Sequence, residues 1–221
     1  MLKLMRRKIG AVQPMTAERP EAATTGDAGR PRPSRIFVAI KIAAEIADEL
    51  AQLTRGLERF RVKLVAPCDI HLTLVPPWNE VSIPEAVEKL RRVADRFDPF
   101  VLTFQHISYG PDPKHPRLLW AECAAGHEIA ELRAALLLAF GKTDERPFRP
   151  HVTLARLRGN GAIIARKHPI DRNLSLVQRV ESVELMQSPP PGGSGYRVLA
   201  SLRLGGAAEK TTPVELLENE S

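Results

Sequence analysis

The sequence predicts an α+β fold built from two related lobes. Three observations indicate this: short apolar runs alternate with segments of helical period, the order strand–helix–strand occurs twice, and the last strand of each repeat begins with the same His-x-Thr-x motif. The chain has 221 residues, of which 43% are hydrophobic and 26% are charged. This length and composition are typical of one globular domain that buries a core.

Short apolar runs rich in β-branched residues predict the strands. Two of them close the fold, at 176–188 and 195–204, around a Pro/Gly loop at 189–195. An irregular stretch is expected after residue 157. The remaining expected strands cover 35–40, 62–66, 70–75, 100–107, 117–123 and 151–157.

Apolar residues spaced three and four apart predict three helices. The first lies within 43–60. The second begins with a capping-box pattern, Ser82 and Glu85, and continues to Phe97. The third ends at Gly141, a residue type common just after helix ends.

The repeated order of elements predicts a duplication. Residues 35–74 and 117–154 each run strand, helix and then a strand opening on the shared motif, although their sequences are only slightly similar. Two related lobes that face each other would bring both motifs to one central cleft.

The fold is expected between residues 35 and 204. Residues 1–34 lack apolar periodicity and are rich in Ala, Pro, Thr and Arg, which predicts a disordered leader. Residues 205–221 are expected to form a flexible tail. The net charge of +6 suits a phosphate-bearing substrate, but much of the excess falls in the leader, so it does not by itself predict extensive nucleic-acid binding.

No metal, cofactor or membrane is expected. No apolar run reaches the roughly 18 residues of a membrane span, and nothing resembling a secretory signal follows the basic N-terminus. Cys68 and Cys123 belong to no Cys/His cluster, which indicates neither a disulfide framework nor a zinc site. We therefore expect a cytoplasmic protein. We also expect it to be a monomer.

The motifs HLTL and HVTL are the candidate catalytic residues. Side chains alternate along a strand, so His71 and Thr73 share one face while Leu72 and Leu74 take the other.

The second motif follows the same alternation. His151 and Thr153 share one face, and their apolar neighbours are expected to anchor the strand in a core. An imidazole near neutral pKa gives or takes a proton, and a threonine hydroxyl donates to a phosphate oxygen. One such histidine is more often structural than catalytic; the matched pair favours function. The unmatched histidines, His106, His115, His127 and His168, are expected to be structural or at the surface.

Several segments resemble the RNA 2′,3′-cyclic phosphodiesterases of the two-histidine phosphoesterase superfamily, formerly called bacterial 2′-5′ RNA ligases. They are RIFVAI, IHLTLV, HPRLLWAE, PFRPHVTLAR and GYRVLASLRL, which together span about 35–204. The resemblance implies a bilobal α+β fold: two antiparallel-sheet lobes with flanking helices and a central cleft. It also implies hydrolysis of RNA 2′,3′-cyclic phosphate ends to 2′-phosphomonoesters.

The resemblance also implies roles for single residues. His71 would be the general acid and His151 the general base. Thr73 and Thr153 would hold the non-bridging phosphate oxygens, and Arg156 would contact the phosphate. Strict alternation would put Arg156 on the core face, so a bend or bulge is needed to redirect it.

Two other residues near the motifs have open interpretations. Arg149 is a weaker candidate for a phosphate contact. Trp78 follows the first motif where the family usually has a Leu-Gly turn; it either stacks on a nucleobase or packs against Pro76 and Pro77.

Other functions remain open at this point. The same chemistry could serve small cyclic nucleotides, or run in reverse to join RNA. A nucleotide- or RNA-binding module that has lost catalysis could use the same scaffold, although both intact motifs argue against it. A zinc or magnesium hydrolase is a more distant alternative.

Overall fold

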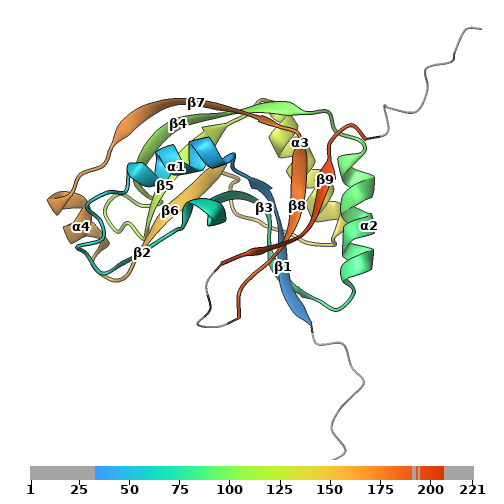
Figure 1. Cartoon of the computed structure of the whole chain (residues 1–221), viewed down its shortest axis with the longest axis horizontal. Coiled ribbons are helices and arrows are strands. Elements are labelled where there is room, and N and C mark those ends of the chain that lie inside the picture. The colour runs from blue at the N-terminus through green and yellow to red at the C-terminus, as the bar shows by residue number, and fades with distance from the viewer. Residues whose placement is uncertain (1–32, 191–192, 194, 207–221) are drawn as a thin grey trace, which may run out of the picture. The chain divides into compact units, whose positions relative to one another are not determined.

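A nine-stranded antiparallel sheet with helices packed on it forms the fold, in a computed structural model that describes residues 33–190, 193 and 195–206. Eight strands follow the order β7-β4-β5-β6-β3-β1-β8-β9, and β2 pairs with β6 (Figure 1). The strands are β1 (Ser34–Lys41), β2 (Val62–Leu64), β3 (His71–Glu80), β4 (Phe100–Gly110), β5 (Leu118–Ala124), β6 (His151–Leu157), β7 (Arg172–Val180), β8 (Ser182–Gln187) and β9 (Arg197–Arg203). The helices are α1 (Ala44–Gln52), α2 (Ile83–Ala94), α3 (His127–Ala139), α4 (Gly161–Lys167) and the 3₁₀ turn η1 (Pro67–Asp69).

The sheet order confirms the two related halves. One half reads β7-β4-β5-β6 and the other β3-β1-β8-β9, so β6 and β3 meet at the centre. The unit β1-α1-β3 in one half corresponds to β5-α3-β6 in the other. In each unit the first strand, β1 or β5, pairs antiparallel with the strand that carries the motif, β3 or β6. The α+β prediction is therefore confirmed, and both motifs lie on the two central strands.

One face of the sheet carries the main core. Alternate strand residues, such as Ile36, Val38 and Ile40 of β1, are buried there with residues from all four α-helices. The opposite face of β1 and β8 carries a separate small cluster, Phe37, Ala39 and Met186, against which Tyr196 packs. The helices thus leave one sheet face available for a site.

The first helix is shorter than its apolar period predicted. It ends at Gln52 instead of continuing toward Phe60. The Thr54 hydroxyl donates to the Ala51 carbonyl at 2.7 Å, and Gly56 turns the chain with a φ of 87°. Leu57 is nevertheless fully buried, so its place in the apolar pattern reflects core packing rather than helix.

The expected strand 176–188 is two strands. A break at Glu181 separates β7, which pairs with β4, from β8, which pairs with β1 and β9. The chain thereby passes from one half of the sheet to the other, as Figure 1 shows. The prediction was wrong because the apolar pattern continues through the break.

Two smaller expectations at element ends also need correction. The stretch after residue 157, expected to be irregular, contains α4. Ser82 is the N-cap of α2 but makes no side-chain capping bond; the Glu80 carboxylate instead accepts from the N–H groups of Val81 and Ser82, at 3.0 and 3.2 Å.

The expected leader, 1–34, and tail, 205–221, lie almost wholly outside the described residues, so those limits stay a prediction. The first described strand begins at Ser34 and the last ends at Arg203. In the described part of the chain, no helix is both long and apolar enough to cross a membrane.

Candidate active site

The two motifs lie side by side at the centre of the sheet. Strands β3 and β6 are antiparallel, with Leu72 paired to Val152. This register places His71 opposite Thr153 and Thr73 opposite His151. All four face away from the main core, while Leu72, Leu74, Val152 and Leu154 are at most 1% exposed behind them.

The register sets the separation of the two imidazoles. Directly opposite side chains in an antiparallel pair have Cβ atoms about 4.5–5.5 Å apart, and diagonal neighbours lie about 7–8 Å apart. His71 and His151 are diagonal neighbours.

Both rings are held in the same way. His71 Nδ1 lies 2.7 Å from the Asp69 carbonyl oxygen, and His151 Nδ1 lies 2.7 Å from the Arg149 carbonyl oxygen. A carbonyl only accepts, so Nδ1 donates in each case and the proton on Nδ1 is fixed. Nε2 of each ring is then the atom that gains or loses a proton.

Aromatic rings fix the imidazoles from the side. His71 packs against Phe37 and Tyr196, with ring centroids 5.0 and 4.9 Å away, and His151 packs against Trp120 at 4.5 Å. Rings held by packing and by a backbone hydrogen bond are oriented before any ligand arrives.

Burial and nearby cations lower the pKa of both histidines. For His71, burial is the largest cause, and the charges of Arg156 and His151 also lower the pKa, whereas the hydrogen bond to the Asp69 carbonyl and the charge of the Asp69 carboxylate raise it. For His151, burial again lowers the pKa most, and Arg156 and Arg149 add to it, while Glu122 opposes. Near neutral pH the free site therefore favours uncharged imidazoles.

Arg156 reaches this face because β6 contains a bulge. Ala155 pairs with Leu119 of β5, but Thr153 pairs with Trp120, so β6 has one extra residue between them. Leu154 and Ala155 are both buried, and Arg156 is exposed on the side of Thr153. The bulge that Arg156 needs in order to reach this face is present, and the charge of Arg156 lowers the pKa of both histidines.

The same bulge occurs in β3. Val75 pairs with Val38 and Thr73 with Ala39, so Leu74 and Val75 are both buried. The residue that corresponds to Arg156 in this half is Pro76. The two halves therefore share a backbone design, but only one supplies a cation at this position.

A family model described as the 2′-5′ RNA ligase superfamily matches residues 42–188, about two thirds of the chain. The chain belongs to the 2′-5′ RNA ligase superfamily. At family level its activity is that of a two-histidine phosphoesterase.

Curated relatives and solved structures agree with this membership. An RNA 2′,3′-cyclic phosphodiesterase of Thermus thermophilus is 30% identical over 189 residues, covering 78% of this chain and 91% of the relative. One of Bacillus subtilis is 31% identical over 128 residues, covering 54% and 69%. The crystal structure of TT0787 of Thermus thermophilus has a TM-score of 0.63 at 26% identity, covering 77% and 98%, and Escherichia coli LigT complexed with NADP+ has 0.60 at 24%, covering 78% and 99%.

Several residues beside the superfamily motifs were missed from the sequence. The strand register puts Lys41 opposite His71 and Glu122 opposite His151, on the same face. Trp120 and Tyr196 complete the surroundings of the rings. The one signal in the sequence was the alternate spacing of Trp120 and Glu122, which puts both side chains on one face of a strand. Which residues of another strand lie opposite them depends on the pairing register, and the local sequence does not reveal that register.

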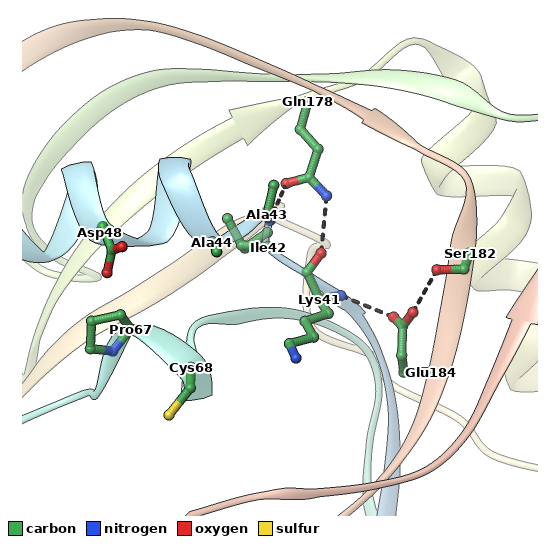
Figure 2. A pocket seen from close by; sticks show the side chains of 10 residues that line it. All are labelled: Lys41, Ile42, Ala43, Ala44, Asp48, Pro67, Cys68, Gln178, Ser182 and Glu184. Carbon is green, nitrogen blue, oxygen red and sulfur yellow. Dashed lines mark hydrogen bonds between the residues drawn. The ribbon is translucent and has the colours of Figure 1, made fainter.

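The end of β1 is held from two sides, as Figure 2 shows. The buried Glu184 carboxylate accepts from the Lys41 N–H at 3.0 Å and from the Ser182 hydroxyl at 2.6 Å. The Gln178 side chain accepts from the Ala43 N–H and donates to the Lys41 carbonyl, each at 3.0 Å. Because Lys41 lies opposite His71, these bonds fix one flank of the site.

Trp78 does not lie in a loop. It is within β3, 8% exposed on the core side, with its ring 4.9 Å from that of Phe140, and its Nε1 donates to Glu80 at 3.0 Å. Stacking on a nucleobase is therefore excluded, and its core partner is Phe140. Arg149 is exposed, with its guanidinium 5.9 Å from the centre of the Trp120 ring, at the rim of the site.

The hollows beside Lys41 and beside Arg61 are not lined by His71 or His151. Their volumes are about 510 Å³ and about 580 Å³, respectively. Among the residues that the structure describes, no group of three or more His, Cys, Asp or Glu side chains is placed to hold a metal ion.

Proposed function

We propose that this chain hydrolyses RNA 2′,3′-cyclic phosphate ends to 2′-phosphomonoesters by acid–base catalysis with two histidines. The observation that carries the proposal is the diagonal pair of imidazoles on β3 and β6, each with Nδ1 tied to a carbonyl and Nε2 left to act. The name shared by the curated relatives, RNA 2′,3′-cyclic phosphodiesterase, supports the same reaction.

In the proposed reaction, His151 Nε2 removes a proton from a water molecule as the water oxygen forms a bond to phosphorus. The bond from phosphorus to the 3′ oxygen breaks, and His71 Nε2 delivers a proton to that oxygen. The products are a 3′ hydroxyl and a 2′-phosphomonoester. One proton is removed and one is delivered, so two groups that titrate near neutrality account for the proton transfers without a metal ion.

Charge that builds on the non-bridging oxygens needs fixed donors. Thr73 and Thr153 lie beside the histidines on the same face, and their hydroxyls are suited to donate to those oxygens. Arg156 adds a cation that keeps its charge at any pH of interest. Such donors contribute most where charge develops in the transition state.

The direct test is to incubate the full chain with an oligoribonucleotide ending in a 2′,3′-cyclic phosphate and to identify the phosphomonoester isomer. We expect only the 2′ isomer, at a rate that excess chelator does not change. A 3′-phosphomonoester would reverse the roles of the two oxygens and contradict the mechanism. Tight binding of the oligonucleotide without any turnover would instead favour a binding module, and loss of turnover with chelator would favour a metal hydrolase.

A further inference from the structure

A row of cations continues from the site along the ribbon formed by β2 and β6. Lys63 pairs directly with Arg156, and both are exposed on the face that carries His151. Arg61 precedes β2 and Arg158 follows β6, two residues further along each strand, where alternation returns their side chains to the same face. Between them, Leu157 is buried.

These four cations are not paired with a carboxylate within the described residues. None of them forms an ion pair or a side-chain hydrogen bond there, whereas other arginines do: Arg133 binds Asp144 at 2.8 Å, for example. Like charges directly opposite each other on neighbouring strands destabilise a sheet. An anion bound to this surface would reduce the repulsion between the cations, so the surface is suited to bind one.

The row is continuous with the site and extends away from it. Arg156, which the bulge in β6 places on the face of His151 and Thr153, stands at one end. Along a strand, alternate residues on one face are about 6.6 Å apart, a spacing comparable to that of successive phosphates on an extended single strand. A hollow of about 580 Å³ at the far end is lined by Arg61, Val62, Lys63, Arg158 and Asn160.

The chemistry of the substrate restricts what occupies this row. In an RNA that ends in a 2′,3′-cyclic phosphate, every other phosphate lies on the 5′ side of the end. A row of cations that leads away from the proposed site of the cyclic phosphate is therefore suited to meet the backbone of the preceding nucleotides. A cyclic mononucleotide has no phosphate to place there.

We infer that the β2–β6 ribbon binds the backbone phosphates of single-stranded RNA 5′ to the cyclic end through Arg61, Lys63 and Arg158. The inference rests on the proposed function and deepens it, because these contacts make an RNA end a better substrate than a cyclic mononucleotide. Lysine and arginine contacts of this kind are electrostatic, independent of base sequence and weakened by salt.

The test is the full chain carrying Arg61→Gln, Lys63→Gln and Arg158→Gln together. We expect the KM for a hexanucleotide with a 2′,3′-cyclic phosphate to rise about 10- to 100-fold at low salt. Turnover of a 2′,3′-cyclic mononucleotide should change less than about twofold. The slope of log KM against log salt concentration should fall by about 2, because each single-strand phosphate that the variant no longer neutralises lowers that slope by about 0.7.

A matched control removes three exposed arginines of the helix α2 region, by Arg91→Gln, Arg92→Gln and Arg96→Gln. It changes the net charge equally, so its KM for the hexanucleotide should stay near that of the wild type. An equal effect in both triple variants, or an equal rise in KM for the cyclic mononucleotide, would overturn the inference.

Direct binding separates this inference from the proposed function. Fluorescence anisotropy with a labelled hexanucleotide ending in a 3′ phosphate measures binding to the ribbon without turnover. Weaker binding only in the ribbon variant supports the ribbon even if the chain hydrolyses nothing. Unchanged binding in a chain that hydrolyses cyclic ends would remove the ribbon and leave the proposed function standing.

Discussion

At the scale of single residues, the two histidines have matching supports and different neighbours. Each donates from Nδ1 to the carbonyl two residues before it, and each packs on an aromatic ring. Their strand partners differ: Glu122 lies opposite His151 and raises its pKa, whereas Lys41 lies opposite His71, whose pKa the Asp69 carboxylate raises. Each ring thus has a carboxylate that favours its protonated form, supplied by η1 for His71 and by β5 for His151.

The lowered pKa values predict a pH profile. Both imidazoles lose their proton below the ordinary value of 6.5, so the bell-shaped profile of kcat/KM should be centred on the acid side of neutrality. Bound phosphate adds negative charge that favours the protonated rings, so the profile of kcat should lie at higher pH. The same lowering means that the histidines' contribution to stability is present above 6.5 and is lost as the pH falls through the lowered values.

Replacing Arg156 tests the cause of that shift. Arg156→Gln removes a cation that lowers the pKa of both histidines, so both limbs of the kcat/KM profile should move to higher pH. The loss of a charged donor should also reduce kcat about 10²–10³-fold. Arg149→Gln is the matched control. The Arg149 cation lowers the pKa of His151 but not that of His71, so a smaller shift of the kcat/KM profile is expected. Limbs that stay in place in Arg156→Gln would show that Arg156 does not act on the histidines.

At the scale of elements, the bulges in β3 and β6 turn an alternating strand into a site. Each bulge buries two consecutive residues and returns the next one to the face of the histidines. Alternation along HVTLAR was enough to predict that Arg156 needs such a bulge. The sequence pattern did not predict the end of α1 or the break between β7 and β8. Buried apolar residues, such as Leu57 after α1, continue the apolar spacing beyond the point where the helix or strand ends.

The packing behind the histidines predicts a stability difference. Leu72 is fully buried between His71 and Thr73, so Leu72→Ala should lower the free energy of unfolding by about 2–5 kcal/mol through the cavity it leaves. Leu138 is 83% exposed, and Leu138→Ala should change it by less than about 0.5 kcal/mol. Urea unfolding of both variants measures the difference. Equal stabilities would mean that the apolar positions of the motif are not buried as described.

At the scale of the whole described fold, the site is shared between two halves. The motif strands β3 and β6 belong to different halves and meet through a single paired position, Leu72 with Val152. The fold class, the duplication and the placement of the four motif residues on one face followed from the sequence, because each depends on local alternation and on a repeated order of elements. Lys41, Glu122 and Tyr196 did not, because their place beside the histidines depends on pairing between segments far apart in the chain.

The most direct test of the histidine pair measures cyclic-phosphate hydrolysis by His71→Ala, His151→Ala and the double variant. Each single variant should lose about 10²–10⁴-fold in kcat with unchanged unfolding behaviour, because each removes one proton transfer of the same step. The double variant should lose far less than the product of the two single losses, since the groups act as a unit. Near-normal turnover in either single variant, or losses that multiply, would contradict the account.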